Sequence, residues 1–126
     1  MSQKKNRPLS PSAKKVLTYI VRHIRKGEVI PDDPRTFLGY KEIHDDLRLP
    51  MAGDTYGNSL KHQGLEELAV WARDGGFPAV SGLVVDREKL SLGDGYYEIH
   101  GQPSTAFAWW RHQVAASLVF DWSPYL

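Results

Sequence analysis

The stretch that decides the fold is PAVSGLVVDREKLSLGDGYYEIHG, residues 78–101. Aliphatic and β-branched residues dominate 79–85, and aromatic residues open 96–100, a pattern typical of two short strands. The segment between them is charged and contains an Asp-Gly turn signal, so it suits a loop that joins strands. The pattern therefore predicts a two-stranded hairpin, whose role depends on the elements before and after it.

Residues 10–26 give the clearest helix pattern in the chain. Ser10 can cap the helix, and Pro11 suits its first position because the ring fixes a helical φ. Gly27 can end the helix in the left-handed conformation. The apolar residues recur at a spacing of three and four, which predicts one buried face: Ala13, Val16, Leu17, Ile20, Val21 and Ile24.

Two further helices, joined by a short turn, precede the hairpin. A short strand at 36–38 leads into a helix over 40–47, and the next helix covers 54–74 with either Asp54 or Thr55 as its cap. Two helices with a short turn, followed by a hairpin, are the elements of a winged helix-turn-helix. The order of elements therefore predicts an α+β winged helix-turn-helix with an additional C-terminal helix.

Length and composition favour one domain without disulfides. The chain has 126 residues, no cysteine and no apolar run long enough to cross a membrane. Its N-terminus is basic but lacks the apolar segment of a secretory signal. We therefore expect a cytoplasmic protein with a basic, disordered arm at residues 1–9 and a single domain at residues 10–126.

The net charge of +1 hides a strong asymmetry. The first 26 residues contain no acidic residue, whereas the other 100 residues carry a net charge of −7. Basic N-terminal arms often bind phosphates, although such a tail can also act only as a solvated, solubilising segment. The eight basic residues of the first part are Lys4, Lys5, Arg7, Lys14, Lys15, Arg22, Arg25 and Lys26.

Double-stranded DNA is the partner that these features predict. Amide, hydroxyl and cationic side chains at the start of the third helix suit base edges and phosphates: Thr55, Tyr56, Asn58, Ser59, Lys61 and His62. Other cations can hold the backbone, namely Lys4, Lys5, Arg7, Lys14 and Lys15 from the arm and first helix, and Arg87 and Lys89 from the hairpin tip. Residues 40–75, however, carry four basic and seven acidic residues, which favours a protein partner instead.

The segments TFLGYKEIHDDLRLP, YGNSL and GGFPAVSGLVVDREKLSLGDGYYE resemble the DNA-binding domain of O6-alkylguanine-DNA alkyltransferases and alkyltransferase-like proteins, over roughly residues 36–98. The matching positions are Tyr40, Glu42 and Ile43 of a first helix, Gly57 of the recognition helix, Val84-Val85 of the active-site strand, and the stretch 93–96. The resemblance implies a winged-helix scaffold and a DNA-facing geometry.

The departures from that family exclude its chemistry. Ser81, Gly82 and Leu83 fall where the family has Cys, His and Arg, and its intercalating arginine falls near Asp54 or Thr55. Alkyl transfer requires a thiolate nucleophile, which this chain lacks. We therefore expect no enzyme, and we carry over no catalytic residue.

No other catalytic or metal-binding pattern is evident. The chain lacks the P-loop pattern, the nucleophile elbow of hydrolases and the H-E-x-x-H motif. No two of the five histidines have the i, i+4 spacing of metal ligands: His23, His44, His62, His100 and His112. We expect no cofactor, metal or small-molecule substrate.

Aromatic residues gather near the C-terminus. A final helix over 102–118 would bury Phe107, Trp110, Val114 and Leu118 on one face, followed by an extended edge segment at 119–122. Trp109 lies about 100° around that helix from Trp110. An exposed patch for a protein partner or a homodimer would comprise Trp109, Trp122 and Tyr125, unless the terminal segment folds back and buries them. The alternative function is thus a protein-interaction module, such as a phage- or mobile-element-encoded inhibitor or adaptor of a nucleic-acid-processing complex.

Overall fold

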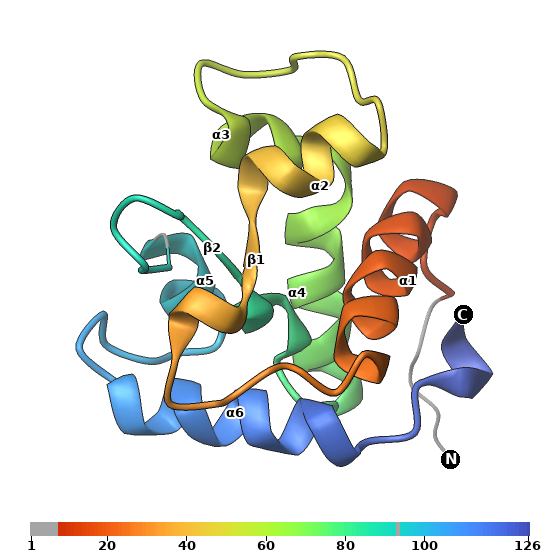
Figure 1. Cartoon of the computed structure of the whole chain (residues 1–126). Coiled ribbons are helices and arrows are strands. Elements are labelled where there is room, and N and C mark those ends of the chain that lie inside the picture. Colours follow the sequence, from red (N-terminus) through yellow and green to blue (C-terminus); the bar gives the residue numbers. More distant parts are fainter. Residues whose placement is uncertain (1–7, 93) are drawn as a thin grey trace.

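The computed structural model describes residues 8–92 and 94–126. The predicted arm contacts Lys4, Lys5 and Arg7 lie outside the described residues. Within the described part, no helix is long and apolar enough to span a membrane. The elements are α1 (Pro11–Arg25), β1 (Leu38–Gly39), α2 (Tyr40–Asp46), α3 (Tyr56–Leu60), α4 (Glu66–Gly75), β2 (Val84–Val85), α5 (Asp94–Ile99) and α6 (Phe107–Val119) (Figure 1).

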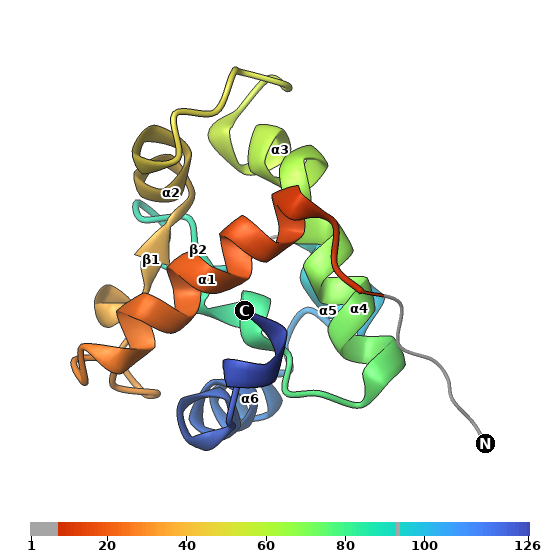
Figure 2. The same ribbon diagram turned by 90° about the vertical axis from the view of Figure 1, so that its right-hand side faces the viewer.

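The first helix forms as its sequence predicts. The Ser10 hydroxyl accepts a hydrogen bond from the Ala13 N–H, Pro11 occupies the first turn, and Gly27 has a φ of +76° just after the helix. The buried face of α1 packs against α4 and the turn before it. Figures 1 and 2 show α1 on one side of the molecule and α6 running beneath the other helices.

The core lies between α1, α4, α6 and the two short strands. Its fully buried apolar side chains come from residues 13–85 and, in α6, from Val114, and they include Ile43, which the sequence predicts as an inward residue of α2. The largest of them are Phe37, Leu17, Ile20, Leu38, Ile43, Leu60, Leu68 and Leu83. This shared core fixes α2, α3 and the segment around β2 relative to one another.

The predicted third helix is broken in the middle. Thr55, rather than Asp54, caps α3 by accepting a hydrogen bond from the Asn58 N–H at 3.1 Å. A kink within Lys61–Leu65 then separates α3 from α4, with non-helical backbone angles at Gln63 and at Gly64, whose φ is +129°. This glycine lies directly against the first turn of α1, so the kink allows the two backbones to approach closely.

The predicted hairpin is wrong. Of its first expected strand, 79–85, only Val84–Val85 is extended as β2, and Val80–Leu83 form a turn of 3₁₀-helix before it. Residues 94–99 form α5 instead of a returning strand, and β2 pairs in parallel with β1, with Leu38 opposite Val84. One antiparallel bridge, between Asp86 and Ser91, closes the intervening loop. Tyr96 and Tyr97 are adjacent and both buried, which a half-buried strand with alternating faces does not allow. The molecule mixes helices with a small two-stranded sheet, which agrees with the predicted α+β class.

The C-terminal segment folds back onto the body. Trp122 is only 2% exposed, and its Nε1 donates a hydrogen bond to the Ser117 carbonyl at 2.9 Å, so this residue is not part of an exposed patch. Tyr125 packs against Trp71 and Phe77, and no strand forms at 119–122. The expectation that Phe107 is core is also wrong, because it is 56% exposed at the first turn of α6.

Candidate nucleic-acid interface

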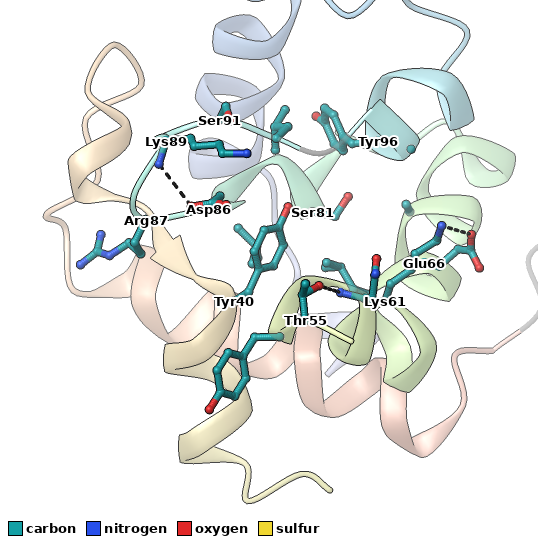
Figure 3. A pocket seen from close by; sticks show the side chains of 18 of the residues that line it. Tyr40, Thr55, Lys61, Glu66, Ser81, Asp86, Arg87, Lys89, Ser91 and Tyr96 are labelled. Atoms are coloured by element: carbon teal, nitrogen blue, oxygen red, sulfur yellow. Dashed lines mark hydrogen bonds and ion pairs between the residues drawn. The ribbon is translucent and has the colours of Figure 1, made fainter. Parts of the chain in front are cut away.

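A cavity of about 700 Å³ lies between the start of α2, the helices α3 and α4, the loop after β2, and α5 (Figure 3). This volume is within the range of sites that hold a small molecule or one unit of a polymer. The cavity wall combines apolar side chains, such as Leu65, Val84 and Ile99, with cationic and hydroxyl groups. Groups of this kind are the ones that the sequence predicts as contacts to DNA.

The cavity brings together two groups of residues that the sequence predicts separately. The start of the third helix and the loop after β2 are about 30 residues apart in the chain, yet both line the same wall. The predicted contacts that share it are Thr55, Tyr56, Asn58, Lys61, Arg87 and Lys89. His62 is exposed but does not line this cavity, and Lys14 and Lys15 lie on α1, away from it.

Ser59 is not available for DNA, contrary to the prediction from sequence. Its side chain is fully buried, and its hydroxyl lies 2.8 Å from His44 Nε2. The same oxygen accepts hydrogen bonds from the Ala52 N–H at 2.7 Å and from Gln63 Nε2 at 3.0 Å. Because Ser59 faces α2, its hydroxyl holds the turn between the two helices instead of facing solvent.

Arg87 is held by the main chain next to β1. Its Nη1 donates hydrogen bonds to the carbonyl of Phe37 at 2.8 Å and to that of Arg35 at 3.1 Å. The stem of Arg87 covers Gly39, where an added Cβ would lie 2.3 Å from its Cγ. In Figure 3 the guanidinium points away from the centre of the cavity. Arg87 therefore fixes the loop after β2 through these main-chain contacts.

The two lysines of the cavity differ in their partners. Lys61 Nζ lies 3.7 Å from Glu66 Oε2, and both side chains are about half exposed. Lys89 forms no ion pair within the described part of the chain, and its main-chain N–H donates to Asp86 Oδ1 at 3.2 Å. Asp86 also accepts the Glu88 N–H, so this carboxylate shapes the loop that presents Lys89.

Ser81 is the residue that reasoning from sequence missed as a member of the site. It is 3% exposed, it lines the cavity, and its hydroxyl has no hydrogen-bond partner among the described residues. A buried hydroxyl without a partner costs free energy unless a ligand or water satisfies it. A signal for it exists in the sequence, because the resemblance places Ser81 at the position of the alkyltransferase cysteine.

The segment around Ser81 is held by its neighbours. Tyr96 Oη donates to the Ala79 carbonyl at 3.0 Å, and Trp110 Nε1 donates to the Gly82 carbonyl at 2.8 Å. Burial raises the pKa of the Tyr96 hydroxyl far above its ordinary value, so the hydroxyl stays protonated and keeps donating this hydrogen bond. These two hydrogen bonds hold the backbone on either side of Ser81, whose buried hydroxyl has no partner among the described residues.

His100 connects this site to the aromatic cluster behind it. Its ring lies 5.2 Å from the ring of Tyr96 and 5.5 Å from that of Trp109, between centroids, and its buried Nε2 has no partner in the described residues. Burial, and to a lesser extent the positive charge of Arg73, lower the pKa of His100 below its ordinary value of 6.5.

This lowered pKa predicts a loss of stability on acidification. Below pH 6.5 the unfolded chain binds a proton at His100 that the folded chain does not, so the free energy of unfolding should decrease as the pH falls from there towards the lowered pKa. Urea unfolding between pH 5 and 8 measures this slope. His100→Gln should flatten it, and His112→Gln, an exposed residue on α6, is the matched control. A slope unchanged by His100→Gln would contradict the assignment.

Among residues 8–92 and 94–126, no three His, Cys, Asp or Glu side chains lie together in a way that could hold a metal ion. Comparisons of the chain with protein-family models, curated proteins and solved structures find no match. The resemblance to alkyltransferases therefore stays a prediction from the sequence motifs, and the geometry of the cavity carries the functional argument.

Proposed function

We propose that this chain is a non-catalytic DNA-binding protein whose cavity face meets the duplex. The observation that carries the proposal is the convergence of α3 and the loop after β2 on one wall with the unpartnered hydroxyl of Ser81 behind it. Hydroxyl, amide and lysine side chains on such a wall are the groups that bind phosphates and base edges. In this proposal α2 and α3 act as the helix-turn-helix pair, and residues 86–91 act as a short wing.

The charges of the wall support contact with a polyanion. Four cationic residues line the cavity against three acidic ones: Lys41, Lys61, Arg87 and Lys89 against Glu66, Asp86 and Glu88. Lys41 pairs with Asp45 at 2.7 Å and Lys61 lies 3.7 Å from Glu66, so Lys89 is the lysine of this wall that forms no ion pair within the described residues. Asp86 already accepts two N–H groups of its own loop. Lys41 also lies over the Tyr56 ring, 5.4 Å from its centroid, which places both groups at the same rim. Contacts to phosphates from several lysines provide affinity without a chemical step.

Salt dependence of binding tests the proposal. Lys61→Ala and Lys89→Ala should each weaken binding to mixed-sequence duplex DNA and make the plot of log affinity against log salt less steep by about one unit. Arg111→Ala is the control, because this exposed arginine on α6 pairs with Asp32 and does not line the cavity. Wild-type affinity and slope in both lysine variants would exclude the cavity face as the DNA contact.

Protein interaction is the second candidate function. The predicted aromatic patch is largely covered, because Trp122 is buried and Trp109 and Tyr125 are half-buried against other rings. Phe107 and Val119, at the two ends of α6, are exposed instead. The two residues are twelve positions apart, about 18 Å along the helix axis, so a protein partner would have to span α6 to cover both. No DNA binding by the wild-type chain at low salt would favour this second function.

A further inference from the structure

The outer face of α1 is a second cationic surface, separate from the cavity. It carries five exposed basic residues, and the helix contains no acidic residue. These residues are Lys14, Lys15, Arg22, Arg25 and, at the C-cap, Lys26. No ion pair engages Lys14, Lys15 or Arg22 within residues 8–92 and 94–126, so their charges remain available to a partner.

This surface faces away from the cavity. The buried side of α1 packs on α4, while the cavity uses Leu65, Glu66 and Ala69 near the start of α4 together with the loop after β2. Figures 1 and 2 agree that α1 and the loop after β2 lie on opposite sides of the molecule. A short, stiff duplex seated on the cavity face therefore cannot also lie along the outer face of α1.

A groove of about 380 Å³ runs along this face, between α1 and the end of α2. Lys15 and Arg22 are seven residues apart, so they lie on the same side of the helix and about 10 Å apart along its axis. Thr18 and Tyr19 lie between them in the sequence and also line the groove. Two carboxylates act on Tyr19 at the edge of the groove: Asp46 accepts a hydrogen bond from its hydroxyl, and the charge of Glu42 lies near enough to oppose that of Arg22.

The chemistry of this groove fits a phosphate backbone better than a protein. Lysine, arginine and threonine side chains are the usual partners of phosphate oxygens. A protein partner would instead need a large apolar or aromatic anchor, and the apolar residues of this groove are only Pro11 and Leu47, beside the ring of Tyr19. Charge complementarity therefore selects nucleic acid as the occupant.

We propose that the protein joins two DNA segments, one on the cavity face and one on the outer face of α1. This inference rests on the proposed function, because the first segment is the duplex that the cavity face binds. The α1 face would bind without sequence preference, since it offers only contacts to the backbone. The two surfaces belong to one chain, so no dimer is needed for two segments to meet.

A capture experiment with the full chain tests the inference. One short duplex is immobilised, the protein is added, and a second fluorescent duplex is then supplied in solution. The α1 variant is Lys15→Ala/Arg22→Ala and the cavity variant is Lys61→Ala/Lys89→Ala. Arg35→Ala/Arg111→Ala is the charge control, since it removes the same number of positive charges and both arginines pair with carboxylates elsewhere. Circular dichroism verifies that each variant is folded.

The wild type and the three variants should differ in how much of the second duplex they capture. Wild type and the charge control should capture the second duplex, and the α1 variant should still bind the immobilised duplex but capture about tenfold less of the second. Wild-type capture by the α1 variant would overturn the inference, as would no capture by the wild type. If the cavity variant binds the single duplex with wild-type affinity and salt slope, the proposed function fails instead, and the two failures are thereby distinguished.

Discussion

Gly64→Ala should lower the free energy of unfolding by about 3 kcal/mol or more, the largest effect we expect from a single methyl group in this chain. Gly64 has a φ of +129°, which residues with a side chain rarely adopt. An added Cβ would also lie 2.8 Å from the Ser12 carbonyl oxygen and 3.0 Å from Ala13 Cα. Both atoms belong to the backbone of α1, so neither can move aside without shifting the helix.

The measurement is urea unfolding followed by tryptophan fluorescence. Gly27→Ala is the matched control, because Gly27 also has a positive φ, of +76°, but an added Cβ there meets nothing within 4 Å. It should cost only about 1 kcal/mol, the conformational penalty alone. Similar losses in the two variants would mean that the contact with α1 does not determine the kink. The same kink sets the direction of α3, so Gly64 also positions one wall of the cavity.

Trp122→Ala should lower the free energy of unfolding by about 3–5 kcal/mol, as is typical when a large aromatic residue is removed from a core. The side chain is 2% exposed, it packs against Phe120 at 4.4 Å between centroids, and its Nε1 donates to the Ser117 carbonyl. Trp122→Phe keeps most of the buried area but loses this hydrogen bond, so we expect a smaller loss of about 1–2 kcal/mol.

Phe107→Ala is the control for Trp122→Ala, because it removes an exposed aromatic side chain instead of a buried one. Phe107 is 56% exposed, so its removal should change the free energy of unfolding by no more than about 0.5 kcal/mol. Thermal and urea unfolding of the three variants measure the order of effects. A stable Trp122→Ala variant would indicate that the terminal segment does not fold back in solution, and the exposed aromatic patch would then return as a binding surface.

For the two surfaces that we propose as DNA contacts, the sequence predicts the types of residue but not their arrangement on the molecule. The type of each residue is enough to select cationic and hydroxyl side chains on α1, at the start of the third helix and at the tip of the loop as candidates for phosphate contacts. Chemistry does not state which of them share a face. The fold gathers Lys61 and Lys89 on one wall, moves Lys14 and Lys15 to the opposite side, and buries Ser59.

Elements whose conformation depends only on neighbouring residues are predicted correctly from the sequence. The sequence by itself determined α1, its Ser10 cap, its glycine end and its buried face, because capping and a spacing of three and four depend only on near neighbours. It also determined the inward position of Ile43 and the glycine end of α4. These elements need no distant contact to be specified.

Only the tertiary structure decided the elements whose conformation depends on distant partners. Residues 94–99 form α5, in which the Tyr96 hydroxyl donates a hydrogen bond to the Ala79 carbonyl and the Tyr96 ring packs beside Trp109. A segment of six residues is too short for the spacing of its apolar residues to distinguish a helix from a strand. Arg87 is turned from the cavity by the carbonyls of Arg35 and Phe37, which lie 50 or more residues earlier. In each case a contact remote in the chain outweighs a weak local preference, and such contacts exist only after the core has formed.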